Sequence, residues 1–160
     1  MAEIAVGADH AGFLLKQTIV ESLQKHGWTV LDLGTHDQRP VDYPDIVGTI
    51  CAAVLDGRCP KGIAICGSGV GACVAANKIA GIRAGLCHDN YSAHQGVEHD
   101  NMNILCLGAR VVGPEVAKEL AAAFAGARFS GEARHVRRLE KVLLMEKSQS
   151  PGVASSSAGT

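Results

Sequence analysis

Apolar and polar residues alternate along this chain on two different periods. Short apolar runs that are rich in β-branched residues are typical of strands. We expect strands over Glu3–Val6, Thr29–Leu33, Gly62–Cys66, Arg83–Cys87 and Asn103–Leu107. Longer segments with helical spacing separate them. In the first, Leu15, Ile19 and Leu23 recur on one helical face, and Gly27 stands where that helix would stop. Further helices are expected over residues 43–56, 70–79, 90–97, 113–124 and 133–147.

This alternation predicts an α/β fold with a five-stranded parallel sheet flanked by helices on both faces, a three-layer sandwich. The 160 residues are enough for one domain with a substantial core, which we expect over residues 1–147. The segment SQSPGVASSSAGT, residues 148–160, has no apolar period and is rich in Ser, Gly and Ala. We expect it to be a disordered tail that can be deleted without loss of function.

Composition narrows the classes of function. Apolar residues make up 47%, charged residues 19%, and the formal net charge is −1, so we expect no basic surface for nucleic acid. The start MAEIAVGADH lacks the pattern of a signal peptide, and no apolar run approaches the roughly 20 residues needed to span a bilayer. We therefore expect a soluble cytoplasmic protein with neither nucleic acid nor membrane as a partner.

The chain has six cysteines, which never form a CxxC pair or lie near a suitably spaced pair of histidines. We therefore expect no metal site. Most of the cysteines fall inside apolar runs, where a free thiol behaves as a small hydrophobic side chain. Cys66 is the exception because of the loop that follows it.

Polar side chains follow every expected strand at its end, in GADHAG, GTHDQRPVDYP, CGSGVGAC, CHDNYSAHQGVEHDN and GARVVG. Ligands of open α/β sheets bind beyond the carboxyl ends of the strands. We therefore expect the functional site at the edge that these loops share.

The loop CGSGVGAC combines three alternate glycines, Gly67, Gly69 and Gly71, with a helix that begins near Val70. Glycines leave backbone N–H groups unobstructed, and a helix N-terminus adds partial positive charge, so such a loop can bind an anion. The spacing matches neither a Walker A loop nor GxGxxG. A close-packed strand-to-helix turn would explain the glycines equally well.

Cys66 stands directly before this loop and would share its positive potential, which favours a thiolate. Nucleophilic attack, as in cysteine phosphatases, requires an arginine six residues after the cysteine, where this chain has Ala72. The other thiolate chemistry is general-base removal of a proton from a carbon beside a carbonyl, with the amides stabilising the enediolate oxygen.

Six segments, taken together and in order, resemble the type B ribose-5-phosphate isomerases, a branch of the wider RpiB/LacA/LacB family of sugar-phosphate isomerases: GADHAGF, DYPD, CGSGVGACVAANKIAGIRAGLC, EHDNMN, LGARVVG and ARHVRRLEKV. The resemblance covers about residues 3–145. It implies a Rossmann-like domain that works as a homodimer or a dimer of dimers, with active sites shared at the subunit interface and with no metal or organic cofactor. It also implies interconversion of D-ribose 5-phosphate and D-ribulose 5-phosphate in the pentose phosphate pathway.

The resemblance assigns catalytic roles to matching residues. Cys66 would move a proton between C1 and C2 of the open-chain sugar, since the glutamate that one branch of the family uses instead aligns with Ala72. Ser68 would pass protons between O1 and O2, and His99 would open the furanose ring by acid–base catalysis. The anion hole would be formed by the amides of Gly67, Gly69, Val70 and Gly71.

The resemblance also assigns the substrate ligands. Asp9 and Tyr43 would contact the sugar, while the phosphate would be held by His10, Arg110, Arg134 and Arg138, some of them from a partner subunit. His135 and Arg137 are expected on a solvated helix face. Asn101 and Asn103 are weaker candidates, because Asp100 stands where the family commonly has an asparagine directly after the histidine.

Two other functions remain open. The same scaffold could isomerise a six-carbon sugar phosphate such as allose 6-phosphate or galactose 6-phosphate, because pocket length rather than catalytic chemistry separates these substrates. Alternatively, the chain could be a non-catalytic module that binds a nucleotide or a sugar phosphate through its glycine-rich loop.

Overall fold

The computed structural model describes residues 3–149, which form a parallel sheet in the order β2-β1-β3-β5-β4. The strands are β1 (Ile4–Ala8), β2 (Val30–Asp32), β3 (Gly62–Cys66), β4 (Ala84–Leu86) and β5 (Ile104–Gly108). The helices are α1 (Phe13–Lys25), α2 (Tyr43–Leu55), α3 (Val70–Ala76), α4 (Asn90–Asp100), α5 (Pro114–Gly126) and α6 (Ala133–Ser148). Every strand and helix expected from the sequence is present.

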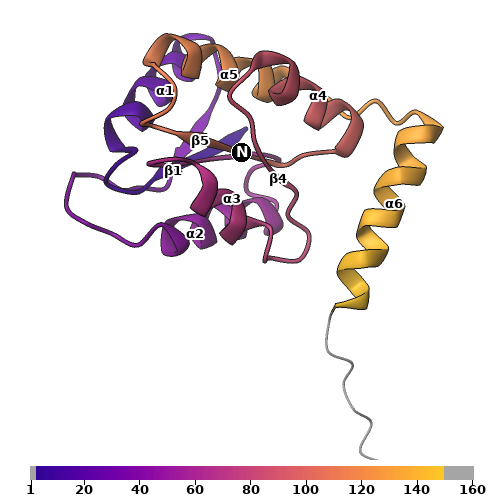
Figure 1. Ribbon diagram of the computed structural model, residues 1–160. Coiled ribbons are helices and arrows are strands. Elements are labelled where there is room, and N and C mark those ends of the chain that lie inside the picture. The colour runs from indigo at the N-terminus through magenta and orange to yellow at the C-terminus, as the bar shows by residue number, and fades with distance from the viewer. Residues whose placement is uncertain (1–2, 150–160) are drawn as a thin grey trace, which may run out of the picture.

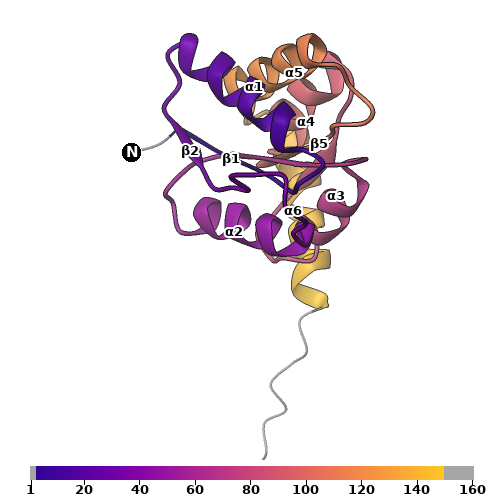
Figure 2. The same ribbon diagram turned by 90° about the vertical axis from the view of Figure 1, so that its left-hand side faces the viewer.

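Helices cover both faces of the sheet, so the three-layer α/β architecture is confirmed. Figures 1 and 2 show α1, α4 and α5 on one face and α2 and α3 on the other. Successive side chains of a strand point to opposite faces. In β3, Ile63 and Ile65 pack under α1, α4 and α5, whereas Ala64 and Cys66 pack under α2 and α3. The candidate base therefore lies on the α2–α3 side of the sheet.

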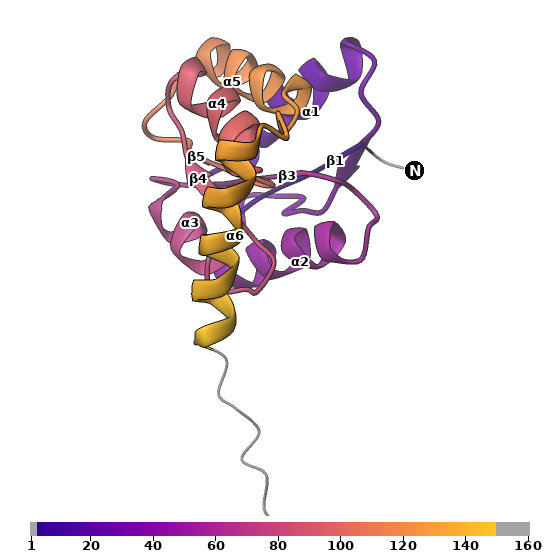
Figure 3. The ribbon, with the colours of Figure 1, turned by 90° about the vertical axis from the view of Figure 1, so that its right-hand side faces the viewer.

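The last helix, α6, stands apart from these layers. Figures 1 and 3 show it extending past the β4 edge of the sheet, with its first turns beside α4. The tail expected over residues 148–160 lies outside the described residues except for Ser148, the last residue of α6, and Gln149, its C-cap.

Helix α4 ends at Asp100, three residues beyond the expected end at Val97. Its last turn is polar, so the apolar spacing carries no signal there. Asn101 ends the helix in the left-handed conformation with φ of 50°. His99 therefore lies on the helix rather than in a loop.

Helix α3 ends earlier than expected, at Ala76 rather than Ile79. The Asn77 side chain accepts a hydrogen bond from the Ala84 N–H and donates one to the Ala84 carbonyl, both at 2.9 Å. Asn77 thus joins the end of α3 to the start of the edge strand β4, a pairing that helical periodicity does not reveal.

Candidate active site

Cys66 ends β3 with its sulfur in the turn that leads into α3. Its side chain is 4% exposed, and the Gly69 N–H donates to Sγ at 3.2 Å. Ser68 follows, and its Oγ accepts from the Val70 N–H at 3.2 Å. The N–H groups of the first helical turn have no acceptor within the helix, so they point their partial positive charge at this turn. The arrangement stabilises negative charge on the sulfur and on a ligand beside it.

The turn depends on a glycine at position 69. Gly69 has φ of +79°, and a Cβ there would lie 2.8 Å from the Leu107 carbonyl carbon and 3.0 Å from the Gly108 nitrogen. Backbone cannot move aside as a flexible side chain can, so β5 supports the loop from behind and leaves no room for a side chain.

A cavity of about 330 Å³ opens in front of this turn. It is lined by Asp9, Tyr43, Cys66, Gly67, Ser68, Gly71, Arg110 and Val111. A Cβ on Gly71 would lie 2.8 Å from the Tyr43 ring, and one on Gly67 would lie 3.4 Å from Arg110 Nη1. The glycines thus let an aromatic ring and a guanidinium group close on the loop. The volume falls within the usual range for small-molecule sites, about 300–1,000 Å³.

The loop after β1 supplies two of the expected ligands. Asp9 is buried, and its Oδ1 accepts from the N–H groups of Ala11 and Gly12 at 3.0 and 3.1 Å. His10 does not line the cavity; its Nδ1 accepts from the Val41 N–H at 3.2 Å. This bond connects the loop after β1 to the segment that carries Tyr43.

The cysteines outside the cavity differ in ionisation. Burial raises the pKa of Cys51 and of Cys87 to about 11. Cys73 on α3 differs, because hydrogen bonding with Cys106, with smaller contributions from the Leu86 backbone and Asn77, lowers its pKa to about 6. The interpretation of cysteines as small hydrophobic side chains holds for Cys51 and Cys87, whereas half-buried Cys73 carries a readily ionised thiol.

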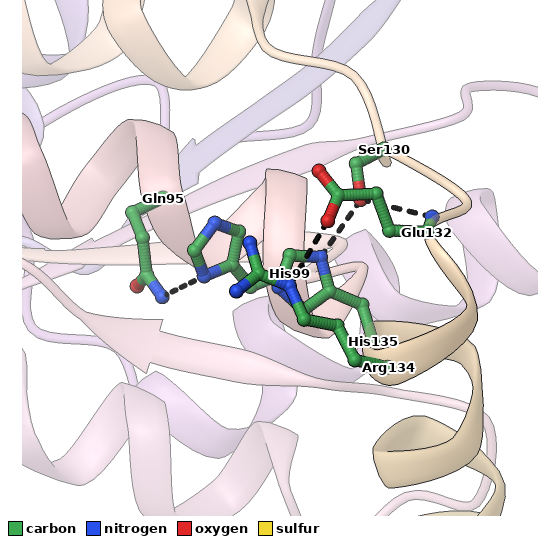
Figure 4. A network of polar contacts seen from close by, with 6 residues as sticks. All are labelled: Gln95, His99, Ser130, Glu132, Arg134 and His135. Carbon is green, nitrogen blue, oxygen red and sulfur yellow. Dashed lines mark hydrogen bonds and ion pairs between the residues drawn. The ribbon is translucent and has the colours of Figure 1, made fainter.

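A second group of candidate residues lies away from this cavity, at the junction of α4 and α6. Figure 4 shows His99 between Gln95 and His135. Gln95 Nε2 lies 2.7 Å from His99 Nδ1, and the rings of His99 and His135 stack with centroids 3.9 Å apart and planes at 26°. The exposed Arg134 donates from Nε to Glu132 at 2.9 Å. One chain therefore keeps the candidate base and the candidate ring-opening histidine in separate places.

His135 is not on a solvated helix face; that expectation is wrong, because its side chain is only 1% exposed. The first turn of α6 packs against the end of α4, and this long-range contact has no signal in the sequence around His135. Gln95 is not among the candidates named from the sequence, although it lies against His99. Its spacing of four residues from His99 places both side chains on one helical face, a signal that was available.

Arg138 lines a different cavity, of about 420 Å³, between α6 and the region of α3 and β4. Asp100, the departure from the family pattern, lines the same cavity. A carboxylate and a candidate phosphate ligand therefore share one surface.

Asn101 and Asn103 hold the connection between α4 and β5. The Asn101 carbonyl accepts from Arg83 Nε at 2.7 Å. The Asn103 side chain accepts from the Arg83 N–H at 2.8 Å and donates to the Gly81 carbonyl at 2.9 Å. Both asparagines line a further cavity of about 440 Å³, separate from that of Cys66. The Asn101 carbonyl and the Asn103 side chain are thus hydrogen-bonded within the fold.

Within residues 3–149, no three side chains of His, Cys, Asp or Glu gather as metal ligands would. None of the helices in this part of the chain is long and apolar enough to cross a membrane.

Comparison with known proteins identifies relatives along almost the whole chain. The family described as Ribose/Galactose Isomerase matches residues 4–142. Ribose-5-phosphate isomerase B of Escherichia coli K12 is 44% identical over 147 residues, which are 92% of this chain and 98% of that protein. D-erythrulose-4-phosphate isomerase of Pectobacterium atrosepticum is 46% identical over 133 residues, 82% of this chain and 87% of that one. The solved structure of Clostridium thermocellum ribose-5-phosphate isomerase B superposes with a TM-score of 0.89 at 44% identity, covering 92% and 99% of the two chains.

Proposed function

Since this chain belongs to the ribose/galactose isomerase family, we propose that it interconverts D-ribose 5-phosphate and D-ribulose 5-phosphate. The observation that carries this proposal is the cavity at the end of β3, where the Gly69 N–H donates to Cys66 Sγ. As a thiolate, Cys66 removes the C2 proton of the open-chain aldose and returns it to C1. The amides at the start of α3 stabilise the enediolate, and Ser68 passes a proton from O2 to O1.

The substrate lies across the cavity in this proposal. Asp9 and Tyr43 contact the sugar, Arg110 binds the phosphate, and His10, which lies outside the cavity lining, binds it from the neighbouring loop. The Arg110 guanidinium beside Gly67 supports this orientation, because its planar fork can donate two hydrogen bonds to one phosphate. The chemistry needs neither a metal nor an organic cofactor, so turnover should survive incubation with a chelator.

We propose further that two copies of the chain complete each site, as a homodimer alone or within a dimer of dimers. His99, Arg134 and Arg138 would then reach the cavity of the partner subunit. Support comes from the lining of the Cys66 cavity, which includes none of these three residues in one chain, and from apolar side chains exposed beside the cavity loop. Val70 and Val74 on α3 are 51% and 56% exposed. An exposed apolar patch of this kind is typical of a surface that a second copy covers.

Subunit complementation tests the shared site. Neither Cys66→Ala nor His99→Asn homodimers should turn over ribose 5-phosphate at more than a small fraction of the wild-type rate. After the two variants are mixed equally, dissociated and reassociated, half of the dimers carry both chains, and each of these has one intact site. The mixture should recover about a quarter of the wild-type activity. A mixture that stays inactive, although mass spectrometry detects the mixed dimers, would show that each site lies within one chain.

Substrate length is the second question, because six-carbon sugar phosphates remain an alternative and one relative is named for a four-carbon substrate. We propose the five-carbon sugar because the E. coli relative is named for ribose 5-phosphate and the match covers 98% of its length. Measuring kcat/KM for erythrose 4-phosphate, ribose 5-phosphate and allose 6-phosphate decides this. A higher kcat/KM for either of the other sugars would change the assigned substrate but leave the reaction type intact.

A non-catalytic binding module would behave differently. It would bind ribose 5-phosphate equally well with and without Cys66→Ala and would never produce ribulose 5-phosphate. Turnover by the wild type, lost in Cys66→Ala while calorimetry still detects sugar-phosphate binding, would exclude the module.

We place the proposed reaction in the cytoplasm, as a step of the pentose phosphate pathway. A phosphorylated sugar is charged and does not cross a bilayer unaided, so its isomerase must share its compartment. Fractionation of cells followed by the isomerase assay tests this location.

A further inference from the structure

The His99 ring is held on two sides by residues outside the roles described so far. Gln95, one helical turn earlier on α4, lies 2.7 Å from His99 Nδ1. His135, from α6, covers one face of the ring at a centroid distance of 3.9 Å. Figure 4 shows this arrangement from close by. With Nδ1 engaged, Nε2 is the nitrogen left to exchange a proton with a substrate.

His135 is itself fixed in place. It is buried, and its Nδ1 lies 2.8 Å from Ser130 Oγ, which also accepts from the Glu132 N–H at 3.3 Å. The Ser130 N–H donates to the Glu98 carbonyl at 2.9 Å and so ties this loop to the last turn of α4. The His135 side chain is therefore positioned by the loop before α6, which the backbone of α4 holds in place.

Burial and the neighbouring groups favour the neutral form of His135. Burial is the main cause that lowers the pKa of His135, and interactions with His99, Arg134 and Arg138 add to it, against an opposing effect of Glu132. A neutral ring can lie against His99 whether or not His99 carries an extra proton. The stack can therefore persist through a proton-transfer cycle.

We propose that Gln95 and His135 are positioning residues for ring opening, which hold the His99 ring so that Nε2 faces the substrate. This inference rests on the proposed isomerase function. In the step concerned, the bond between C1 and the ring oxygen O4 breaks, and O4 takes the proton from Nε2. The O1 hydroxyl loses its proton to water, the C1 carbonyl forms, and His99 regains a proton from water.

The reaction can be run with and without ring opening. Ribose 5-phosphate is mostly a furanose and must open before isomerisation. Ribulose 5-phosphate cannot form a furanose, since its C5 oxygen carries the phosphate, and its product aldehyde closes spontaneously in water. A defect confined to His99 positioning should therefore slow the forward reaction and spare the initial rate of the reverse reaction.

Four variants separate the contributions. Gln95→Met keeps the side-chain length and removes the hydrogen bond. His135→Asn keeps a polar partner for Ser130 and removes the ring, whereas His135→Phe keeps a ring to stack and removes that partner. His94→Gln is the matched control, because His94 lies on the same helix but pairs with Glu98 at 3.1 Å outside the stack.

We expect Gln95→Met and His135→Asn to lower kcat for ribose 5-phosphate about tenfold, with KM little changed and the reverse rate within about twofold. His135→Phe should retain most of the forward rate, and His94→Gln all of it. Equal losses in both directions, or a His135→Asn variant as active as the wild type, would overturn the inference. If His135→Asn fails to fold, Gln95→Met alone decides, since Gln95 is only half-buried. A folded wild type inactive in both directions would instead overturn the proposed function.

Discussion

The two groups of candidate residues are built in different ways. The cavity at Cys66 is made largely of backbone: a glycine turn, the first amides of α3 and the β5 strand behind them. The histidine pair consists of side chains from α4 and α6, and its geometry depends on how these helices meet. Backbone amides held by a sheet need no rearrangement to stabilise developing charge. Proton transfer at a ring oxygen instead needs a titratable side chain, which only packing can orient.

The largest effect that this comparison predicts is at Cys66. Cys66→Ala should lower kcat for ribose 5-phosphate by about 10³-fold, because general acid–base groups contribute on the order of 10²–10⁴. The amides remain in place, so binding measured by calorimetry should change little.

Cys66→Ser is the accompanying control for shape, since it keeps a small polar side chain that ionises far less readily. It should be nearly as inactive as Cys66→Ala. Substantial activity in either variant would mean that another group removes the proton and would assign the sulfur a packing role.

The next effect concerns the backbone of the cavity. Gly69→Ala should lower the free energy of unfolding by about 2–4 kcal/mol, from a strained φ together with overlap against rigid backbone. Gly48→Ala in α2 is the control, and its change in the free energy of unfolding should have the opposite sign. A Cβ there meets nothing within 4 Å, and alanine should stabilise the helix by about 0.5–1 kcal/mol. Urea denaturation of both variants measures the contrast, and equal changes would contradict it.

The same contrast explains what the sequence could predict. The cavity residues follow strands, and the apolar alternation places every strand, so a site at the carboxyl ends could be predicted near Cys66 and Asp9. His135 could not be placed, because its burial depends on α6 meeting α4 across many residues of intervening chain. Asn103 illustrates the same limit: the resemblance makes it a candidate ligand, whereas its amide is taken up by the backbone of Arg83 and Gly81. Local patterns thus predict elements and loops, and long-range packing decides which polar groups are left for a substrate.

A smaller effect is expected at Asp100 on the α4–α6 side. Its carboxylate lines the same cavity as Arg138, so it would repel the phosphate dianion that Arg138 is proposed to bind. Asp100→Asn should lower KM for ribose 5-phosphate about three- to tenfold with kcat nearly unchanged, and added salt should reduce the difference.

The control for net charge is Asp56→Asn at the end of α2, where Asp56 pairs with Arg58 at 3.4 Å. It should leave KM unchanged. If the two variants alter KM equally, the effect of Asp100 would be one of overall charge and Arg138 would have no special part in it.

The smallest effect is the dependence of stability on pH at the histidine pair. Burial lowers the pKa of His135 in the folded chain, whereas the unfolded chain takes up this proton near the ordinary value of about 6.5. Below that pH the unfolded state binds more protons, so the contribution of His135 to stability is complete above about pH 6.5 and declines as the pH falls through the lowered pKa. His135→Phe removes this dependence. Its unfolding free energy relative to wild type should therefore rise as the pH falls from about 7 to about 5, whereas the difference for exposed His94→Gln should change less. Parallel pH profiles for His135→Phe and the wild type would mean that His135 takes up its proton equally in both states and that burial on α6 does not keep the ring neutral.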